Sequence, residues 1–130
     1  DVAHNPHAAA TLAQNLGNMG FHRFTYAVFG IMDDKDIDGV IAPMAGLIDH
    51  WCVTRLDSPR SAQPEALAQK LAAQAPAGAR EGDFSVTAFA TPAEAYANAL
   101  SRAGENDRIV VFGSFYTVAG VMAARKSSLH

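Results

Sequence analysis

The sequence contains little cysteine and no long apolar run. Its single cysteine, Cys52, cannot form a disulfide within the chain, and the apolar segment 50–53 around it indicates a buried thiol in a reducing compartment. No apolar run reaches the length of about 18 residues expected of a membrane-spanning helix, and no charged segment followed by an apolar one opens the chain. These absences favour a soluble, cytoplasmic protein.

An excess of basic charge is also absent. Ten Lys and Arg face thirteen Asp and Glu, and the basic residues are scattered along the sequence. A nucleic-acid-binding protein needs a basic stripe to neutralise phosphates, so this class is excluded. No phosphate loop of the GxxxxGK[ST] type occurs either. If the protein uses a nucleotide, most of the groups that bind its phosphates must lie elsewhere.

The 130 residues, of which 49% are hydrophobic, are enough for one domain with one core, which we expect to span residues 1–130. Apolar and helical patterns alternate along the chain. Strands are predicted at 24–31, 50–56, 85–90 and 107–112, and helices at 6–19, 36–49, 64–75, 91–104 and from 115 to about 125. Pro43 should bend or shorten the second helix.

This alternation predicts an α/β fold, a Rossmann-like three-layer sandwich with a mostly parallel sheet and helices on both faces. The first helix has no complete strand before it, so we expect a strand upstream, largely truncated here, with Asp1 at its carboxyl end. Ligands of open α/β sheets bind at the carboxyl ends of the strands. Four polar segments should therefore share one sheet edge: 1–7, 32–36, 55–61 and 113–116.

The segment Asp1-x-x-His4-Asn5-Pro6 leaves two interpretations open. A strand-to-helix turn suits an anion such as phosphate, with a carboxylate for sugar hydroxyls and an imidazole near a reacting group. The alternative is a helix cap with an incidental histidine. A zinc site at His4 and His7 is not supported, because zinc needs three or four ligands and the other histidines lie on different elements.

Two further turns carry polar residues. The segment 33–36 is either a solvated turn with an Asp cap or a site at which Lys35, held between carboxylates, receives an acidic substrate. The segment 113–117 places Ser114 at a helix start, which suits a carboxylate ligand. A catalytic triad of Ser114, His4 and Asp1 is rejected, because the Gly-x-Ser-x-Gly pattern and the hydrolase order are missing.

Four segments in this order and spacing, DVAHNPHAA, GIMDDKDIDGV, PRSAQPEALA and VVFGSFYTVAGVM, closely resemble the carboxy-terminal domain of bacterial folylpolyglutamate synthases in their bifunctional dihydrofolate synthase form. The resemblance covers essentially the whole chain. These enzymes belong to the Mur ligase-like superfamily of ATP-dependent amide ligases.

The resemblance implies a reaction in folate biosynthesis and one-carbon metabolism. Mg-ATP phosphorylates the carboxyl group of dihydropteroate or the γ-carboxyl group of a folate, and the amine of L-glutamate attacks the acyl phosphate to form an amide. In the family, a larger amino-terminal domain carries the phosphate loop, the Mg²⁺ ligands and most of the folate pocket. The carboxy-terminal domain closes over it, contacts ATP and positions glutamate.

The resemblance also implies roles for individual residues. Asp1 would contact the ATP ribose, His4 would approach the phosphates and the reacting carboxyl group as the catalytic residue, and Asn5 would shape the nucleotide-binding turn. Glutamate would be bound by Lys35, Ser114 and Tyr116, and no metal ligand is expected in this chain.

Because the phosphate loop and the magnesium site are missing, we expect residues 1–130 alone to have no ligase activity and weak nucleotide affinity. The expected partner is the amino-terminal domain of the same chain, in a monomer that binds neither nucleic acid nor membrane. The alternative is a stand-alone, non-catalytic α/β module for ligand binding or regulation. Polar clusters at several strand ends favour the ligase.

Overall fold

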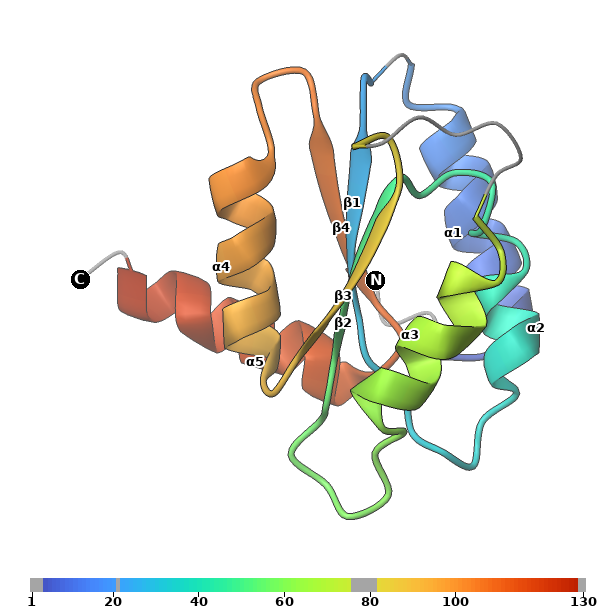
Figure 1. Ribbon diagram of the computed structural model, residues 1–130, viewed down its shortest axis with the longest axis vertical. Helices are drawn as coiled ribbons and strands as arrows, with labels where there is room; N and C mark the ends of the chain where they lie inside the picture. Colours follow the sequence, from blue (N-terminus) through green and yellow to red (C-terminus); the bar gives the residue numbers. More distant parts are fainter. Residues whose placement is uncertain (1–3, 21, 76–81, 129–130) are drawn as a thin grey trace.

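The computed structural model describes residues 4–20, 22–75 and 82–128 (Figure 1). Its helices and strands alternate along the chain. They are α1 (Pro6–Gly17), β1 (Thr25–Phe29), α2 (Ile37–Ile41), β2 (His50–Thr54), α3 (Pro64–Ala72), β3 (Ser85–Phe89), α4 (Pro92–Arg102), β4 (Arg108–Phe112) and α5 (Phe115–Ser128). The predicted strand before α1, and Asp1 with it, lie outside the described residues.

The four strands form one parallel sheet in the order β3-β2-β1-β4. Successive strands β1, β2 and β3 add to one side of the sheet, and the chain then crosses back so that β4 pairs with the other side of β1. Helices cover both faces, as the ribbon shows, with α1, α2 and α3 on one side and α4 and α5 on the other (Figure 1). The predicted three-layer α/β fold is confirmed.

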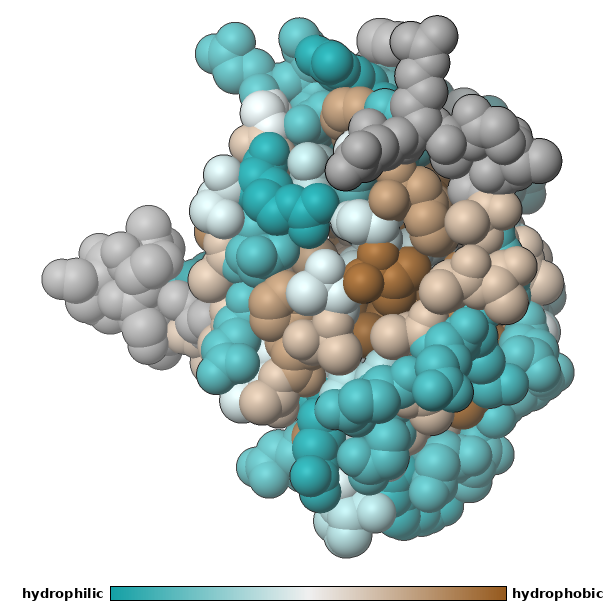
Figure 2. All heavy atoms as spheres, in the orientation of Figure 1, coloured by the Kyte–Doolittle hydropathy of each residue, from teal (hydrophilic) through white to brown (hydrophobic). Residues whose placement is uncertain are grey.

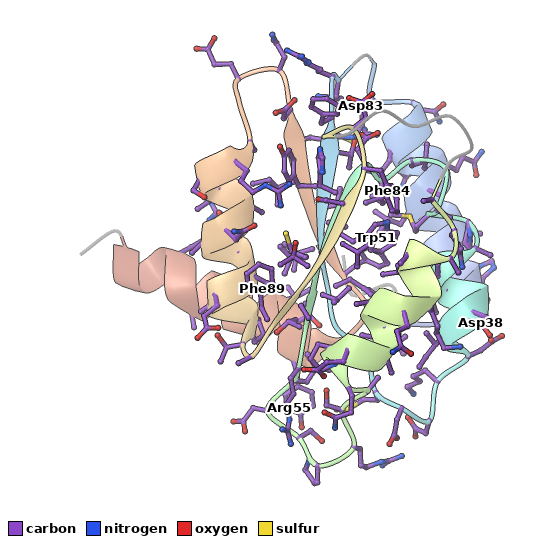
Figure 3. The ribbon with its side chains drawn as sticks, in the orientation of Figure 1. Asp38, Trp51, Arg55, Asp83, Phe84 and Phe89 are labelled. Carbon is purple, nitrogen blue, oxygen red and sulfur yellow. The ribbon has the colours of Figure 1, made fainter. Side chains whose placement is uncertain are left out.

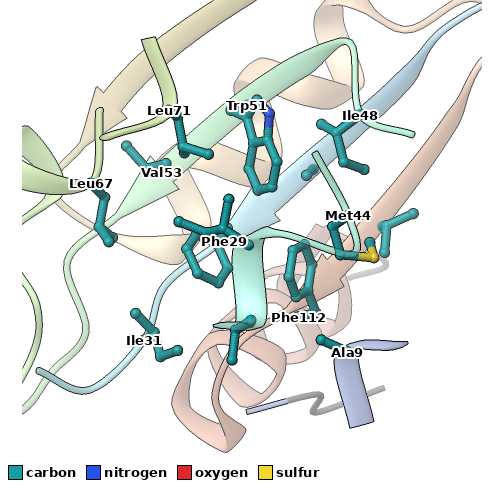
Figure 4. Packing of buried hydrophobic residues seen from close by; sticks show 14 of the residues in the cluster. Ala9, Phe29, Ile31, Met44, Ile48, Trp51, Val53, Leu67, Leu71 and Phe112 are labelled. Atoms are coloured by element: carbon teal, nitrogen blue, oxygen red, sulfur yellow. The ribbon is translucent and has the colours of Figure 1, made fainter. Parts of the chain in front are cut away.

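The core has two parts, one on each face of the sheet, because side chains alternate along a strand. Phe29 packs against Trp51 and Phe112 on the face covered by α1, α2 and α3, with ring centroids 5.7 and 4.8 Å apart (Figure 4). Val28 and Cys52 face α4 and α5 in the second part. The predicted burial of the Cys52 thiol is confirmed, and this burial raises its pKa.

Helix boundaries follow from caps and prolines. The side chains of Asn5, Asp36 and Thr91 accept backbone N–H groups at the starts of α1, α2 and α4. The second helix is shorter than the predicted range 36–49, and the expected shortening at Pro43 is confirmed: α2 ends at Ile41, two residues before Pro43, because proline cannot continue the helical hydrogen bonds. At the other end of the chain, α5 continues to Ser128, beyond the expected end.

A buried polar cluster closes the amino edge of the sheet. His50, 2% exposed, forms a 2.8 Å hydrogen bond between its Nδ1 atom and the Ser85 hydroxyl, and its ring stacks on Tyr26. Arg102 donates from Nη2 to the same hydroxyl at 3.0 Å. Burial and the Arg102 cation lower the pKa of His50, so the neutral imidazole is favoured.

Within the described part of the chain, no helix has the length and apolar character to cross a membrane.

Candidate functional site

The sheet has a switch point between β1 and β4. These strands are neighbours in parallel register, with Phe29 beside Phe112 at their carboxyl ends. The chain leaves β1 toward α2 on one face and leaves β4 toward α5 on the other (Figure 1). Diverging connections of this kind open a crevice outside the carboxyl ends of the strands, which is where open α/β sheets bind ligands.

Two glycines form the floor of this switch point. Gly113 has a φ of +109°, and a Cβ atom there would overlap the carbonyl oxygen of Gly30 and lie 2.8 Å from the Phe29 ring. The buried hydroxyl of Thr117, in the first turn of α5, donates to the same carbonyl oxygen at 2.8 Å. Sequence reasoning missed this contact, although a Phe-Gly pair ends both strands and was the available signal.

Ser114 lies at the start of α5 and is 6% exposed. Its Oγ atom accepts the backbone N–H of Tyr116 at 3.2 Å, and its carbonyl oxygen accepts the N–H of Thr117 at 3.1 Å. The hydroxyl therefore has the position of an N-cap while the first turn of a 14-residue helix begins beside it. Tyr116 follows on this turn and is 47% exposed. The predicted placement of both residues on the last strand-to-helix turn is confirmed.

His4 and Asn5 precede α1 and are exposed. The Oδ1 atom of Asn5 accepts the N–H of Ala8 at 2.8 Å, so the helix-cap interpretation holds for Asn5. The start of α1 packs on the start of α2, since a Cβ atom on Gly39 would lie 2.8 Å from Pro6 Cγ. Asp36 caps α2 beside this contact, and α2 follows β1 in the chain. His4 and Asn5, which precede α1, therefore lie at the edge at which β1 ends.

Lys35 lies in the loop between β1 and α2 and is exposed. Sequence reasoning placed its ammonium group between carboxylates, but among the described residues it forms no salt bridge. Asp34 instead pairs with Arg60, from the loop after β2. Asp36 accepts the N–H of Gly39 at 3.1 Å. Asp34 and Asp36 therefore interact with other groups, and the Lys35 ammonium group is left available at the sheet edge.

The carboxyl edge therefore collects the turn before α1, the loop after β1 and the turn after β4. Figure 2 shows hydrophilic residues over both ends of the molecule, this one included, and more apolar residues between them, beside β3. Asp1 lies outside the described residues, so its predicted place is untested. The roles of His4, Asn5, Lys35, Ser114 and Tyr116 toward ligands stay predictions.

A groove of about 680 Å³ lies at the same edge but beyond β2 and β3. The loop after β2, the start of α4 and Gly120 of α5 line it, and Arg55 lies at this end of the sheet (Figure 3). Among the described residues, none of the predicted site residues lines this groove. We take the switch point as the candidate site, because the loop with Lys35 and the turn with Ser114 follow the neighbouring strands β1 and β4.

The described ranges 4–20, 22–75 and 82–128 hold no group of three or more His, Cys, Asp or Glu side chains placed to bind a metal ion. Burial raises the pKa of Tyr26 and of Cys52 and lowers that of His50, but these side chains lie within the sheet and at its amino edge.

A parallel α/β sheet with polar turns at one switch point defines a Rossmann-like ligand-binding domain. Residues 1–115 match the family model of the Mur ligase glutamate ligase domain. The chain therefore belongs to the Mur ligase, glutamate ligase domain family.

Individual relatives agree with this assignment. The chain is 35% identical over 122 residues to the dihydrofolate synthase/folylpolyglutamate synthase of Escherichia coli strain K12, covering 94% of this chain and 26% of that protein. It superimposes on E. coli FolC in complex with DHPP and ADP with a TM-score of 0.87 and 33% identity, covering 100% of this chain and 28% of the other. A bifunctional folylpolyglutamate synthase/dihydrofolate synthase with Mn, AMPPNP and L-glutamate bound gives a TM-score of 0.78 at 36% identity, with 97% and 28% covered. The chain thus spans about a quarter of the length of these relatives.

Proposed function

We propose that this chain is the carboxy-terminal domain of an ATP-dependent carboxylate-amine ligase that adds L-glutamate to dihydropteroate, to folate, or to both, through an acyl phosphate. The observation that carries the proposal is the parallel pairing of β1 with β4 in a glutamate ligase domain, which sets the loop after β1 beside the turn after β4. A relative of the same fold carries a nucleotide analogue, a divalent metal and L-glutamate together, which supports this set of ligands.

Glutamate is the ligand assigned to the β4–α5 turn and the loop after β1. A substrate carboxylate is attracted by the first turn of α5, which presents backbone N–H groups and the positive end of the helix dipole. Ser114 contributes a hydroxyl at this turn, Tyr116 lines it, and Lys35 supplies a cation from the neighbouring loop. Two anion-binding groups on adjacent strands suit a dicarboxylate amino acid.

ATP is assigned to the turn before α1. When bound, ATP with Mg²⁺ supplies the phosphoryl group that activates the substrate carboxyl group. His4 would lie against the phosphates and the reacting carboxyl group, Asn5 fixes the turn by capping α1, and Asp1 would contact the ribose. Mg²⁺ ligands and the phosphate loop would come from an amino-terminal domain of the same chain, onto which this edge closes in a cytoplasmic monomer.

Product formation tests the proposal directly. The full-length protein that carries these residues should form ADP only when both L-glutamate and dihydropteroate or folate are present, and the glutamyl amide should appear in the same amount. Residues 1–130 alone should form none. Turnover by residues 1–130 alone, or a full-length protein that binds these ligands without turnover, would contradict the proposal; the second outcome would support a regulatory module.

A further inference from the structure

The loop after β1 and the loop after β2 are joined over several residues. The backbone N–H of Asp33 donates to the carbonyl oxygen of Arg60 at 2.7 Å, and the N–H of Ala62 donates to that of Ile31 at 2.9 Å. Between them Met32 and Ser61 form an antiparallel bridge. The loop that carries Lys35 is therefore held by the loop after β2.

Ser61 makes the second loop a firm support. It is 4% exposed, and its Oγ atom accepts the N–H of Leu56 at 2.8 Å while donating to the carbonyl oxygen of Ala62 at 2.9 Å. The N–H of Arg60 donates to the Ser58 hydroxyl at 3.2 Å. The backbone of Arg60 is thus fixed on both sides, and its side chain extends from a defined point.

The loop after β1 carries an excess of negative charge, which Arg60 of the loop after β2 partly neutralises. Three carboxylates, from Asp33, Asp34 and Asp36, surround a single ammonium group in sequence, so the segment 33–36 carries a net charge of −2 (+1 − 3). An anionic substrate is repelled by such a loop unless part of the charge is neutralised. The guanidinium of Arg60 pairs with Asp34, the carboxylate next to Lys35 in the chain.

We propose that Arg60 is a positioning residue for the amino-acid substrate: by pairing with Asp34, it keeps that carboxylate from pairing with Lys35 and leaves the Lys35 ammonium for the substrate carboxylate. This inference rests on the proposed function, in which Lys35 binds glutamate. Arg60 acts through Asp34 and Lys35 and does not itself contact the substrate.

The effects of losing Arg60 on folding stability and on the KM for glutamate distinguish this role from a structural one. Both members of the Arg60–Asp34 pair are largely exposed, with 66% and 44% of their side chains accessible, and exposed ion pairs contribute little to folding stability. Loss of Arg60 should therefore leave the unfolding midpoint almost unchanged. It should instead weaken the ground-state binding of glutamate, which raises KM and leaves kcat nearly constant.

The test is a double-mutant cycle in the full-length protein. Arg60→Gln should raise the KM for L-glutamate roughly three- to tenfold, with kcat within about twofold and the KM for ATP unchanged. Arg60→Lys keeps the cation and should restore most of the affinity. Adding Asp34→Asn to Arg60→Gln removes the competing carboxylate and should return the KM to within about twofold of the parent. Lys70→Gln is the matched control: it also removes the cation of an exposed pair, with Asp38 of α2 at 3.1 Å and not with the carboxylate next to Lys35, and should leave the KM unchanged.

Two results would overturn the inference. If Arg60→Gln leaves the KM for glutamate at the parent value, Arg60 positions nothing. If the double variant is as impaired as Arg60→Gln, the guanidinium contacts the substrate directly and the role assigned through Asp34 is wrong. Lys35→Gln separates this failure from that of the proposed function: if it also leaves the KM unchanged, Lys35 does not bind glutamate, whereas a raised KM in Lys35→Gln alone removes only the role of Arg60.

Discussion

The hydroxyl of Thr117 donates a 2.8 Å hydrogen bond to the carbonyl oxygen of Gly30. The two residues are 87 positions apart, and their bond fixes the first turn of α5 against the end of β1. Since Ser114 lies on the same turn, the position of the proposed glutamate-binding hydroxyl depends on a contact that is itself fully buried.

Thr117→Val should destabilise the fold while nearly conserving side-chain volume. The substitution leaves the buried Gly30 carbonyl without its donor, and a buried unsatisfied acceptor costs about 1–3 kcal/mol. Urea unfolding monitored by circular dichroism should show this loss in the free energy of unfolding. Thr87→Val, at an exposed position of the edge strand β3, is the control and should change it by less than about 0.5 kcal/mol. Equal effects at the two positions would show that the hydrogen bond has no special weight.

Gly113→Ala should be more damaging. A φ of +109° disfavours any side chain, and the added Cβ would overlap the Gly30 carbonyl oxygen, which belongs to the backbone and cannot move aside cheaply. We expect a loss of about 3 kcal/mol or more in the free energy of unfolding. Gly46→Ala, where a Cβ meets nothing within 4 Å, should be close to neutral. A Gly113→Ala protein as stable as the parent would contradict the close approach of Gly113 to the Gly30 carbonyl oxygen at the ends of β4 and β1.

The close approach of Gly113 to Gly30 could not be predicted from the sequence, whereas local features could. The strands could be located because each is an apolar run, and the end of α2 was signalled by Pro43. Capping at Asn5 and Asp36 also followed from local residue types. Local patterns determine such features, because the interactions concerned span only a few residues.

Contacts between distant segments could not be predicted in the same way. The pairing of β4 with β1, instead of with β3 before it, depends on which edge the chain returns to. Lys35 was expected between carboxylates because its neighbours in sequence are acidic. Arg60, 26 residues beyond Asp34, takes that carboxylate instead, and only the packing of the two loops reveals it.

Acid should destabilise the fold through His50. Burial and Arg102 lower the pKa of His50 in the folded state, whereas the unfolded chain binds the proton with the ordinary value near 6.5. The stabilisation is therefore complete above about pH 6.5 and is lost as the pH falls from there toward the lower folded pKa, since the unfolded state then binds more protons. His50→Gln should be less stable than the parent at pH 8, through lost packing, and its free energy of unfolding should fall less between pH 6.5 and 5. Parallel pH curves for the two proteins would contradict this origin of the acid sensitivity.

Ser114→Ala in the full-length protein should raise the KM for L-glutamate roughly tenfold and change kcat little, because the hydroxyl is proposed to bind the substrate in its ground state. It should also lower stability by about 1 kcal/mol through loss of the cap on Tyr116. Thr91→Ala removes a comparable cap at the start of α4, with a 3.1 Å bond to the N–H of Glu94, and controls for this effect. If the KM for L-glutamate is the same in Ser114→Ala, in Thr91→Ala and in the parent, the Ser114 hydroxyl is only a helix cap.

His4→Gln should act on the chemical step. An imidazole placed against the phosphates and the reacting carboxyl group contributes to the transition state, so its loss should lower kcat by about a hundredfold and leave the KM for glutamate within about threefold. His7→Gln is the matched control, because His7 is also exposed on the first turn of α1 and its bond from Thr11 uses the backbone carbonyl oxygen, which the substitution keeps. Single-turnover measurements of ADP formation compare the two variants without interference from product release. Equal rates in His4→Gln and His7→Gln would leave the turn before α1 with its capping role alone, and the catalytic group would then have to come from outside residues 1–130.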